Sequence, residues 1–85
     1  MDFKTFYTSK PVNERESFAQ QAGTTRGHCN QIAFAGRKVD LGMADVFVAL
    51  SGGALTIDDI PLTDRANAQR AIREGAPHQM AASVV

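Results

Sequence analysis

Apolar side chains recur along this chain with the three- and four-residue spacing of amphipathic helices. The first group consists of Phe3, Phe6 and Tyr7. Asp2 stands directly before it, and aspartate commonly caps helices. Because Pro11 cannot continue a helix that precedes it, the pattern predicts a first short helix that ends before this residue.

A second helix is predicted between Pro11 and Gly23. Proline suits the first turn of a helix, and Asn13 with Glu16 has the spacing of a capping box. Glycine ends helices readily because it enters the left-handed conformation without steric cost. The apolar residues of this segment are Phe18, Ala19 and Ala22.

A third helix is predicted to begin after Thr24 or Thr25 and to stop at Gly36. Its inward-facing residues, again at helical spacing, are Cys29, Ile32 and Ala33. The helix is therefore short and apolar on one side only.

A fourth helix, capped by Asp40, is predicted over residues 41–51, with Gly52 and Gly53 as its stop. Its wide apolar stripe predicts that most of it is buried, and it comprises Leu41, Ala44, Phe47 and Val48.

The segment after the fourth helix has weaker signals. Thr56 and Asp59 have capping-box spacing, which allows a single helical turn. The alternation of Leu55 and Ile57 leaves a short strand open as well.

A last helix over residues 65–74 can be capped by Thr63 or Asp64. The apolar side that the pattern assigns to it is small and consists of Ala68, Ala71 and Ile72. Residues 76–85 have no periodicity, and we expect them to form a flexible tail.

Together these segments predict an all-α fold, a small bundle of about five short helices with an additional C-terminal helix. The 85 residues suffice for one domain, which we place at residues 1–62, with residues 63–75 as the C-terminal helix. Because a domain this small buries little surface, we expect a homodimer. Residues 62–75 are the predicted interface element, with Leu50 and Leu55 as neighbours.

The junction of the second and third helices has the pattern of a helix-turn-helix. Two helices that cross steeply need a small residue at their contact, which Ala19 supplies, and a turn residue at positive φ, which Gly23 supplies. Two apolar residues three apart must then face inward on the second helix of the pair. The predicted core residues of the motif are Phe18, Ala19, Gly23, Cys29 and Ile32.

The outward face of the third helix has side chains that suit base edges. Asparagine and glutamine can pair with adenine, and arginine can donate twice to guanine. The expected DNA base contacts are Arg26, His28, Asn30, Gln31 and Phe34. The expected DNA backbone contacts are Thr24, Thr25, Arg37 and Lys38. An ordinary solvated surface is the alternative interpretation of these polar residues.

Charge is segregated along the chain although its net charge is zero. Residues 1–38 contain six cations and three anions, residues 39–64 contain five aspartates and no cation, and the remainder adds a charge of +2. If the N-terminal part forms one surface, that surface is basic and suits an oriented DNA-binding face.

The spaced small and apolar residues resemble those of the YdaS and Cro-like regulators of phages and prophages, which belong to the lambda-repressor-like helix-turn-helix class. The resemblance covers residues 1–62, and its residues are Phe18-Ala19, Gly23-Thr24, Gly27, Gln31-Ile32-Ala33, Gly36, Ala44, Gly52-Gly53-Ala54-Leu55-Thr56 and Asp59. It implies a five-helix fold that binds operator DNA as a transcriptional regulator, often as a dimer. His28 and Cys29 stand where that family more often has tyrosine and leucine.

Other chemistry has little support in the sequence. His28 and Cys29, with His78 far away, lack the spacing of a zinc site, and no phosphate-binding glycine loop or catalytic arrangement appears, so we expect neither a metal, a cofactor nor an enzyme. The single cysteine and the absence of a signal or membrane-spanning run predict a cytoplasmic protein. The competing function is an antitoxin or adaptor that binds a protein partner through the acidic residues 39–64 or the last helix.

Overall fold

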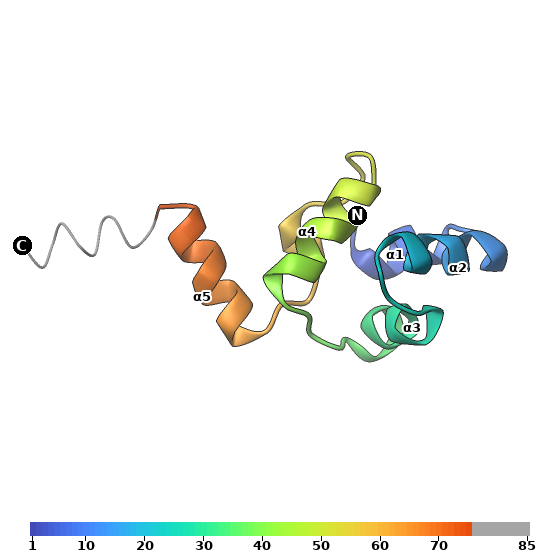
Figure 1. Cartoon of the computed structure of the whole chain (residues 1–85), viewed down its shortest axis with the longest axis horizontal. Helices are drawn as coiled ribbons and strands as arrows, with labels where there is room; N and C mark the ends of the chain where they lie inside the picture. Colours follow the sequence, from blue (N-terminus) through green and yellow to red (C-terminus); the bar gives the residue numbers. More distant parts are fainter. Residues whose placement is uncertain (76–85) are drawn as a thin grey trace, which may run out of the picture.

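The computed structural model describes residues 1–75, which are arranged as α-helices joined by short loops (Figure 1). The elements are α1 (Phe3–Thr8), α2 (Val12–Gln21), α3 (Arg26–Ala35), α4 (Leu41–Leu50), the 3-10 turn η1 (Ile57–Asp59) and α5 (Asp64–Arg73). The predicted all-α fold is thus confirmed for the described residues, and the predicted tail over residues 76–85 lies outside them. Within residues 1–75, no helix combines the length and the apolar character that crossing a membrane requires.

Side-chain caps start four of the five α-helices. In each case an oxygen of the cap accepts a hydrogen bond from the backbone N–H three residues on, which satisfies a donor that the first turn leaves free. These caps are Asp2, Thr25, Asp40 and Thr63. The predicted capping box of Thr56 and Asp59 is also present and begins η1, so the segment forms a helical turn and not the strand that its alternation allowed.

The predicted capping box at Asn13 is wrong. Pro11 is itself the N-cap of α2, without a side-chain hydrogen bond, and Asn13 lies inside the helix. The backbone carbonyl of Pro11 accepts from the N–H groups of Glu14 and Arg15, both at 3.0 Å. The ring of Pro11 fixes φ at the helix boundary, so α2 begins there without a side-chain cap.

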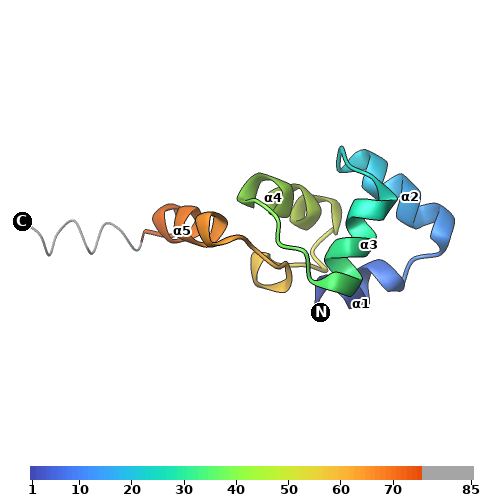
Figure 2. The ribbon, with the colours of Figure 1, turned by 90° about the horizontal axis from the view of Figure 1, so that it is seen from below.

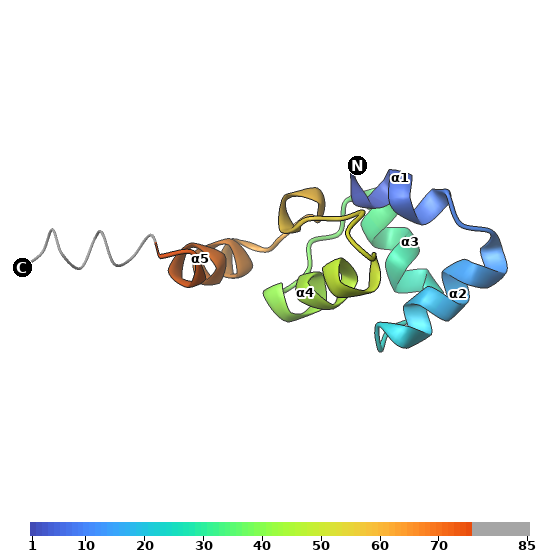
Figure 3. The same cartoon turned by 90° about the horizontal axis from the view of Figure 1, so that it is seen from above.

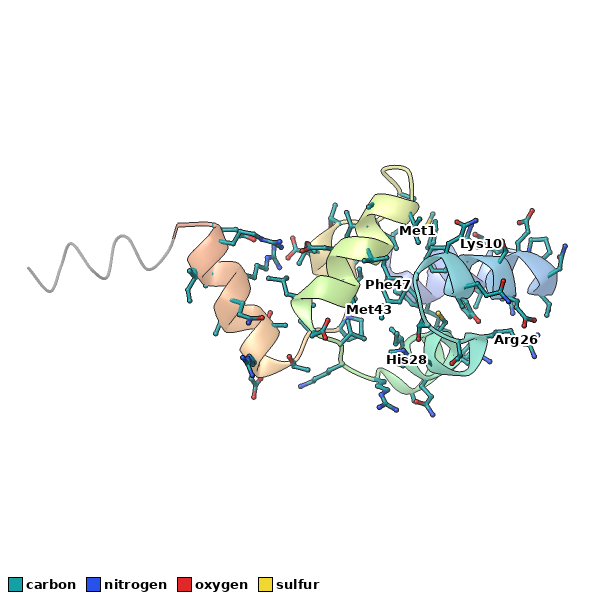
Figure 4. The ribbon with its side chains drawn as sticks, in the orientation of Figure 1. Met1, Lys10, Arg26, His28, Met43 and Phe47 are labelled. Atoms are coloured by element: carbon teal, nitrogen blue, oxygen red, sulfur yellow. The ribbon has the colours of Figure 1, made fainter. Side chains whose placement is uncertain are left out.

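Aromatic rings from three helices form the centre of the core. The Phe47 ring of α4 lies 4.9 Å from the Phe3 ring of α1 and 5.6 Å from the Phe18 ring of α2. Phe6 and Tyr7 complete the cluster against Phe18 and Phe3, respectively. Figure 4 shows Phe47 on the side of α4 that faces the first three helices. This one ring therefore joins the fourth helix to the first two.

Helix α3 packs against both α1 and α2. Figures 2 and 3, which view the molecule from opposite sides, show it crossing these two helices. Its buried residues are Cys29, Ile32 and Ala33, as the helical spacing predicted. The opposite side of α3 consequently faces away from the bundle.

A short backbone pairing, which the sequence pattern did not predict, links the two loops that flank α4 and η1. Val39 donates to the carbonyl of Pro61 at 2.9 Å and accepts from the N–H of Thr63 at 3.0 Å. Val39 and Leu62 are both buried there. This pairing fixes where the chain leaves the bundle toward α5.

Helix α5 lies beside α4, at the end of the bundle remote from α1–α3 (Figure 1). Its one buried residue is Ala66, whereas Ala68 and Ile72 of the predicted apolar side are exposed. The expected interface neighbour Leu55 is wrong, because its side chain is only 2% exposed and belongs to the core. Helix α5 thus packs on its own domain through a residue outside the predicted apolar side, which is left largely exposed.

Candidate nucleic-acid interface

The turn between α2 and α3 spans residues 22–25 and depends on Gly23. This glycine has a φ of +76°, a conformation that side chains other than glycine's rarely adopt. The N–H of Thr24, the next residue, donates to the carbonyl of Ala19 at 2.9 Å and closes the end of α2. The predicted apolar contacts of the motif, namely Phe18, Ala19, Cys29 and Ile32, are all buried. Burial raises the pKa of the Cys29 thiol to about 11, so this residue is a neutral part of the core.

Two threonines organise the start of α3. The Thr25 hydroxyl caps the helix by accepting from the N–H of His28 at 3.1 Å. The Thr24 hydroxyl lies 2.8 Å from Nδ1 of the same histidine, which orients the half-exposed imidazole. Arg26 precedes His28 at the exposed first position of the helix, and both are labelled in Figure 4. The expected contacts at this end of α3 are therefore gathered around one helix terminus.

Asn30 has a partner inside the protein that sequence reasoning missed. Its Oδ1 accepts a hydrogen bond of 2.7 Å from the hydroxyl of Tyr7, a buried residue of α1. Burial raises the pKa of Tyr7, which keeps the hydroxyl protonated and able to donate. Asn30 is accordingly half-buried and not fully on the solvent face of α3. The 23 residues that separate it from Tyr7 left no local signal of this contact.

Gln31 and Arg37 are brought together by the turn that ends α3. Gly36 adopts a φ of +66°, and the N–H of Arg37 then donates to the carbonyl of Gln31 at 3.1 Å. The Arg37 guanidinium also donates to Oε1 of Gln31 at 2.5 Å. Both side chains are exposed, as is Lys38, which follows them. The glycine turn thus places two cations beside the C-terminal end of the outward face.

Phe34 projects from the outward face of α3 with 58% of its surface exposed. The Nζ atom of Lys4, from α1, lies 5.7 Å from the centre of its ring, within the range of a cation–π contact. Lys4 therefore belongs to the same surface. Its position there follows from the packing of α1 on α3, so the sequence pattern did not include it among the expected contacts.

The cations of residues 1–38 carry charges that no carboxylate neutralises at close range. Within the described residues, no side-chain nitrogen of these six lies within 4.0 Å of a carboxylate oxygen. Some contact uncharged groups: Arg15 donates to the carbonyls of Thr8 and Lys10, and the Lys10 ammonium lies over the Phe6 ring. Such contacts position a cation but leave its charge uncompensated. The N-terminal part therefore retains its net positive charge at the surface.

The five aspartates of residues 39–64 are used by the fold. Asp40 caps α4, Asp59 completes the capping box of η1, and Asp64 lies in the first turn of α5, where a negative charge is favourable. Asp45 pairs with Arg73 at 2.7 Å, and Asp58 pairs with Arg70 at 2.6 Å.

No protein-family model matches the sequence, and neither a curated protein nor a solved structure is significantly similar to the chain. The resemblance to YdaS and Cro-like regulators accordingly stays a prediction.

Proposed function

We propose that this chain is a sequence-specific DNA-binding transcriptional regulator, a Cro-like repressor that binds a palindromic operator as a homodimer. The observation that carries the proposal is the position of α3. This helix directly follows a glycine turn, has one side that faces away from the bundle and is flanked by cations without carboxylate partners. In a helix-turn-helix protein, the second helix of the motif enters the major groove in this way.

The outward face of α3 has the groups that the major groove requires. Arg26 and Gln31 are exposed and can hydrogen-bond to base edges, while the exposed ring of Phe34 can contact a thymine methyl group. His28 lies beside them with Nδ1 oriented by Thr24. Asn30 contributes from a half-buried position.

Gly27 supports a close approach of DNA to the start of α3. Glycine within a helix is less stable than alanine, so a helical glycine usually has a steric reason. At Gly27 the protein supplies none, because the nearest atom to an added Cβ would be the Thr25 hydroxyl oxygen at 3.9 Å. We attribute the missing side chain to the DNA backbone, which contacts Thr24, Thr25 and the helix terminus in the proposed complex.

The electrostatics also favour a polyanionic partner. Arg37 and Lys38 flank one end of α3 and Arg26 the other, and Lys4 reaches the same surface from α1. These positions allow phosphate contacts on both sides of a groove occupied by α3. A net charge of zero does not oppose DNA binding here, because Asp45 and Asp58 are paired with arginines of α5 and not with the cations of residues 1–38.

A second copy of the chain is the proposed partner of α5, as part of residues 62–75. Helix α5 buries Ala66 against α4 but leaves Ile72 60% exposed on its other side. An amphipathic helix of ten residues with one buried alanine gains little from packing on its own domain. Pairing with another α5 would cover the exposed side.

The dimer is tested by sedimentation of point variants, which leave the fold intact. Ile72→Glu should shift the protein toward monomer and weaken operator binding, because two like charges would meet across the interface. Val12→Glu is the matched control, since Val12 is 55% exposed on α2. Truncation after Thr63 should give the same result as Ile72→Glu while keeping Leu62 and the Val39 pairing. A protein that stays dimeric in both cases has its interface elsewhere.

The alternative, an antitoxin or adaptor that binds a protein partner, draws support from the exposed Ile72 but not from the acidic segment. Asp45 pairs with Arg73 and Asp58 with Arg70, so two of its five negative charges are already compensated within the protein, which weakens attraction for a basic partner. The exposed side of α5 would remain as the binding surface in that case.

The main test compares binding to duplex DNA that flanks the protein's own gene with binding to random DNA. Gln31→Ala should cost about 1–3 kcal/mol on the selected site and leave binding to random DNA nearly unchanged. Gln20→Ala removes the same group from the exposed surface of α2, outside both α3 and the proposed dimer element, and should change neither. Equal binding of the parent protein to both DNAs, or no effect of Gln31→Ala, would favour the protein-partner alternative.

A further inference from the structure

The two amides on the outward half of α3 are held by their oxygen atoms. Oδ1 of Asn30 accepts from the Tyr7 hydroxyl at 2.7 Å, and Oε1 of Gln31 accepts from the Arg37 guanidinium at 2.5 Å. An amide group is planar, and its oxygen and nitrogen point in different directions from the same carbon. When the oxygen is turned toward a partner in the protein, the NH₂ group remains for an external acceptor.

The contact at Asn30 is the more constrained of the two. Tyr7 is fully buried and stacks on Phe3 with ring centres 5.7 Å apart, so its hydroxyl has a fixed position. The carbonyl of Arg26 is a second acceptor for that hydroxyl, but at 3.5 Å it is much farther than Oδ1 of Asn30. The single hydroxyl proton therefore goes to Asn30. By contrast, the Gln31 contact is exposed to solvent and to the DNA itself.

This orientation changes which base Asn30 can read. Bidentate recognition of adenine by asparagine needs the NH₂ group on N7 and the oxygen on the N6 amino group, side by side. Because the Asn30 oxygen points toward the buried Tyr7, the amide turns its NH₂ group outward, and these donors would face the N6 donor of adenine. Guanine shows two acceptors, N7 and O6, and no donor at the same edge.

We infer that Tyr7 is a specificity-determining positioning residue, which turns Asn30 into a donor-only reader that selects guanine over adenine in the operator. The inference rests on the proposed DNA-binding function and refines it. Tyr7 itself does not touch DNA, since it is buried between α1 and α3. Its effect is exerted through one hydrogen bond to the recognition helix.

The experiment begins with selection of preferred sites from a randomised duplex library by the parent protein. Asn30→Ala then identifies the position that Asn30 reads, as the one at which base preference is lost. At that position we expect the parent to prefer guanine over adenine by about tenfold, the discrimination that one good side-chain contact provides. Tyr7→Phe keeps the ring and its stacking but removes the hydroxyl, so Asn30 can rotate and the preference should move toward adenine.

A second variant keeps the inference testable if Tyr7→Phe is poorly folded. Asn30→Asp has the same shape and can still accept from Tyr7, but its outer oxygen accepts where the amide donated. The selected base should then change from guanine to cytosine, whose N4 amino group is a donor. Thermal unfolding of each variant separates a loss of fold from a change in preference.

The outcomes separate this inference from the proposed function. If the parent protein selects no sequence at all, the proposed function fails. If it selects a site but Asn30→Ala alters no position, the inference fails while DNA binding stands. The inference is also overturned if the parent prefers adenine at the Asn30 position, if a folded Tyr7→Phe keeps the full guanine preference, or if a folded Asn30→Asp does.

Discussion

Charged residues have different structural roles in the two halves of the described chain. In residues 39–75, aspartates cap α4 and η1, and Arg70 and Arg73 pair with carboxylates of neighbouring elements. In residues 1–38, the six cations have no carboxylate within 4.0 Å in the described structure. The zero net charge of the chain is therefore a sum over two differently charged halves, and it does not describe the surface of either half. The difference also separates a structural end of the molecule from the end that we propose binds DNA.

The largest expected effect is a loss of stability when a glycine at positive φ is replaced, and we compare Gly23, in the turn of the N-terminal half, with Gly52 of the C-terminal half. Gly23→Val should cost roughly 1–2 kcal/mol or more in stability, because a β-branched side chain is strained at positive φ. An added Cβ meets no atom within 4 Å, so the cost is conformational. Gly52→Val, at a φ of +64° and equally open, should destabilise similarly. Thermal unfolding measures both.

The two glycine variants should nevertheless differ in DNA binding. At temperatures where both are folded, Gly23→Val should weaken operator binding because it displaces α3, whereas Gly52→Val should bind as the parent does. Equal DNA affinity of the two folded variants would mean that the register of the turn does not matter for the interface.

The cations themselves are compared through the salt dependence of DNA binding. Arg37→Ala and Lys38→Ala should each weaken binding to every sequence and reduce the log–log salt slope by about one unit per protomer, as expected when one phosphate contact is lost. Arg65→Ala, which removes an exposed cation at the start of α5, is the matched control, and with its dimer verified by sedimentation it should leave the slope unchanged. A slope that falls as much for Arg65 would show that the charge effect is general and not confined to the proposed face.

Two helical glycines at equivalent positions allow a comparison in which the expected changes in stability are smaller but only one variant should lose DNA affinity. Gly27 and Gly42 each stand two residues after a capping residue, Thr25 and Asp40 respectively, and an added Cβ has ordinary space at both. Replacement by alanine should therefore stabilise both variants, by about 0.4–1 kcal/mol in thermal or urea unfolding. Gly27→Ala should at the same time weaken DNA binding, and Gly42→Ala should not. Unchanged DNA affinity of Gly27→Ala would remove the argument for close contact there.

The smallest effect concerns the ion pair that helps to hold α5. The hydrogen bond from Arg70 lowers the pKa of Asp58 below its ordinary value of 3.8. A lowered pKa in the folded state means that the pair contributes above pH 3.8 and is lost as the pH falls through the folded value. Carboxyl NMR titration should show this low pKa in the parent and a return toward 3.8 in Arg70→Gln. Because exposed ion pairs contribute little, we expect only a slight change in overall stability.

The helices and their boundaries were largely predictable from the sequence. Caps such as Asp2, Thr25 and Asp40 act on a backbone N–H three residues away, and Gly23 and Gly36 end helices through their own φ angles. These interactions are local, so they depend little on the rest of the fold. The capping box predicted at Asn13 was wrong because α2 already begins after Pro11, two residues earlier.

Tertiary structure decided which side chains of those helices are free. The Tyr7–Asn30 bond joins residues 23 apart and the Arg73–Asp45 pair joins residues 28 apart. Contacts over such separations leave no periodic signal in the sequence, because they depend on how whole helices pack. The same packing buried Ala66, which lies outside the apolar side that the sequence pattern assigned to α5. The sequence by itself therefore determined where the helices begin and end and which face of α3 is apolar, whereas long-range packing determined the orientation of Asn30 and the seat of α5.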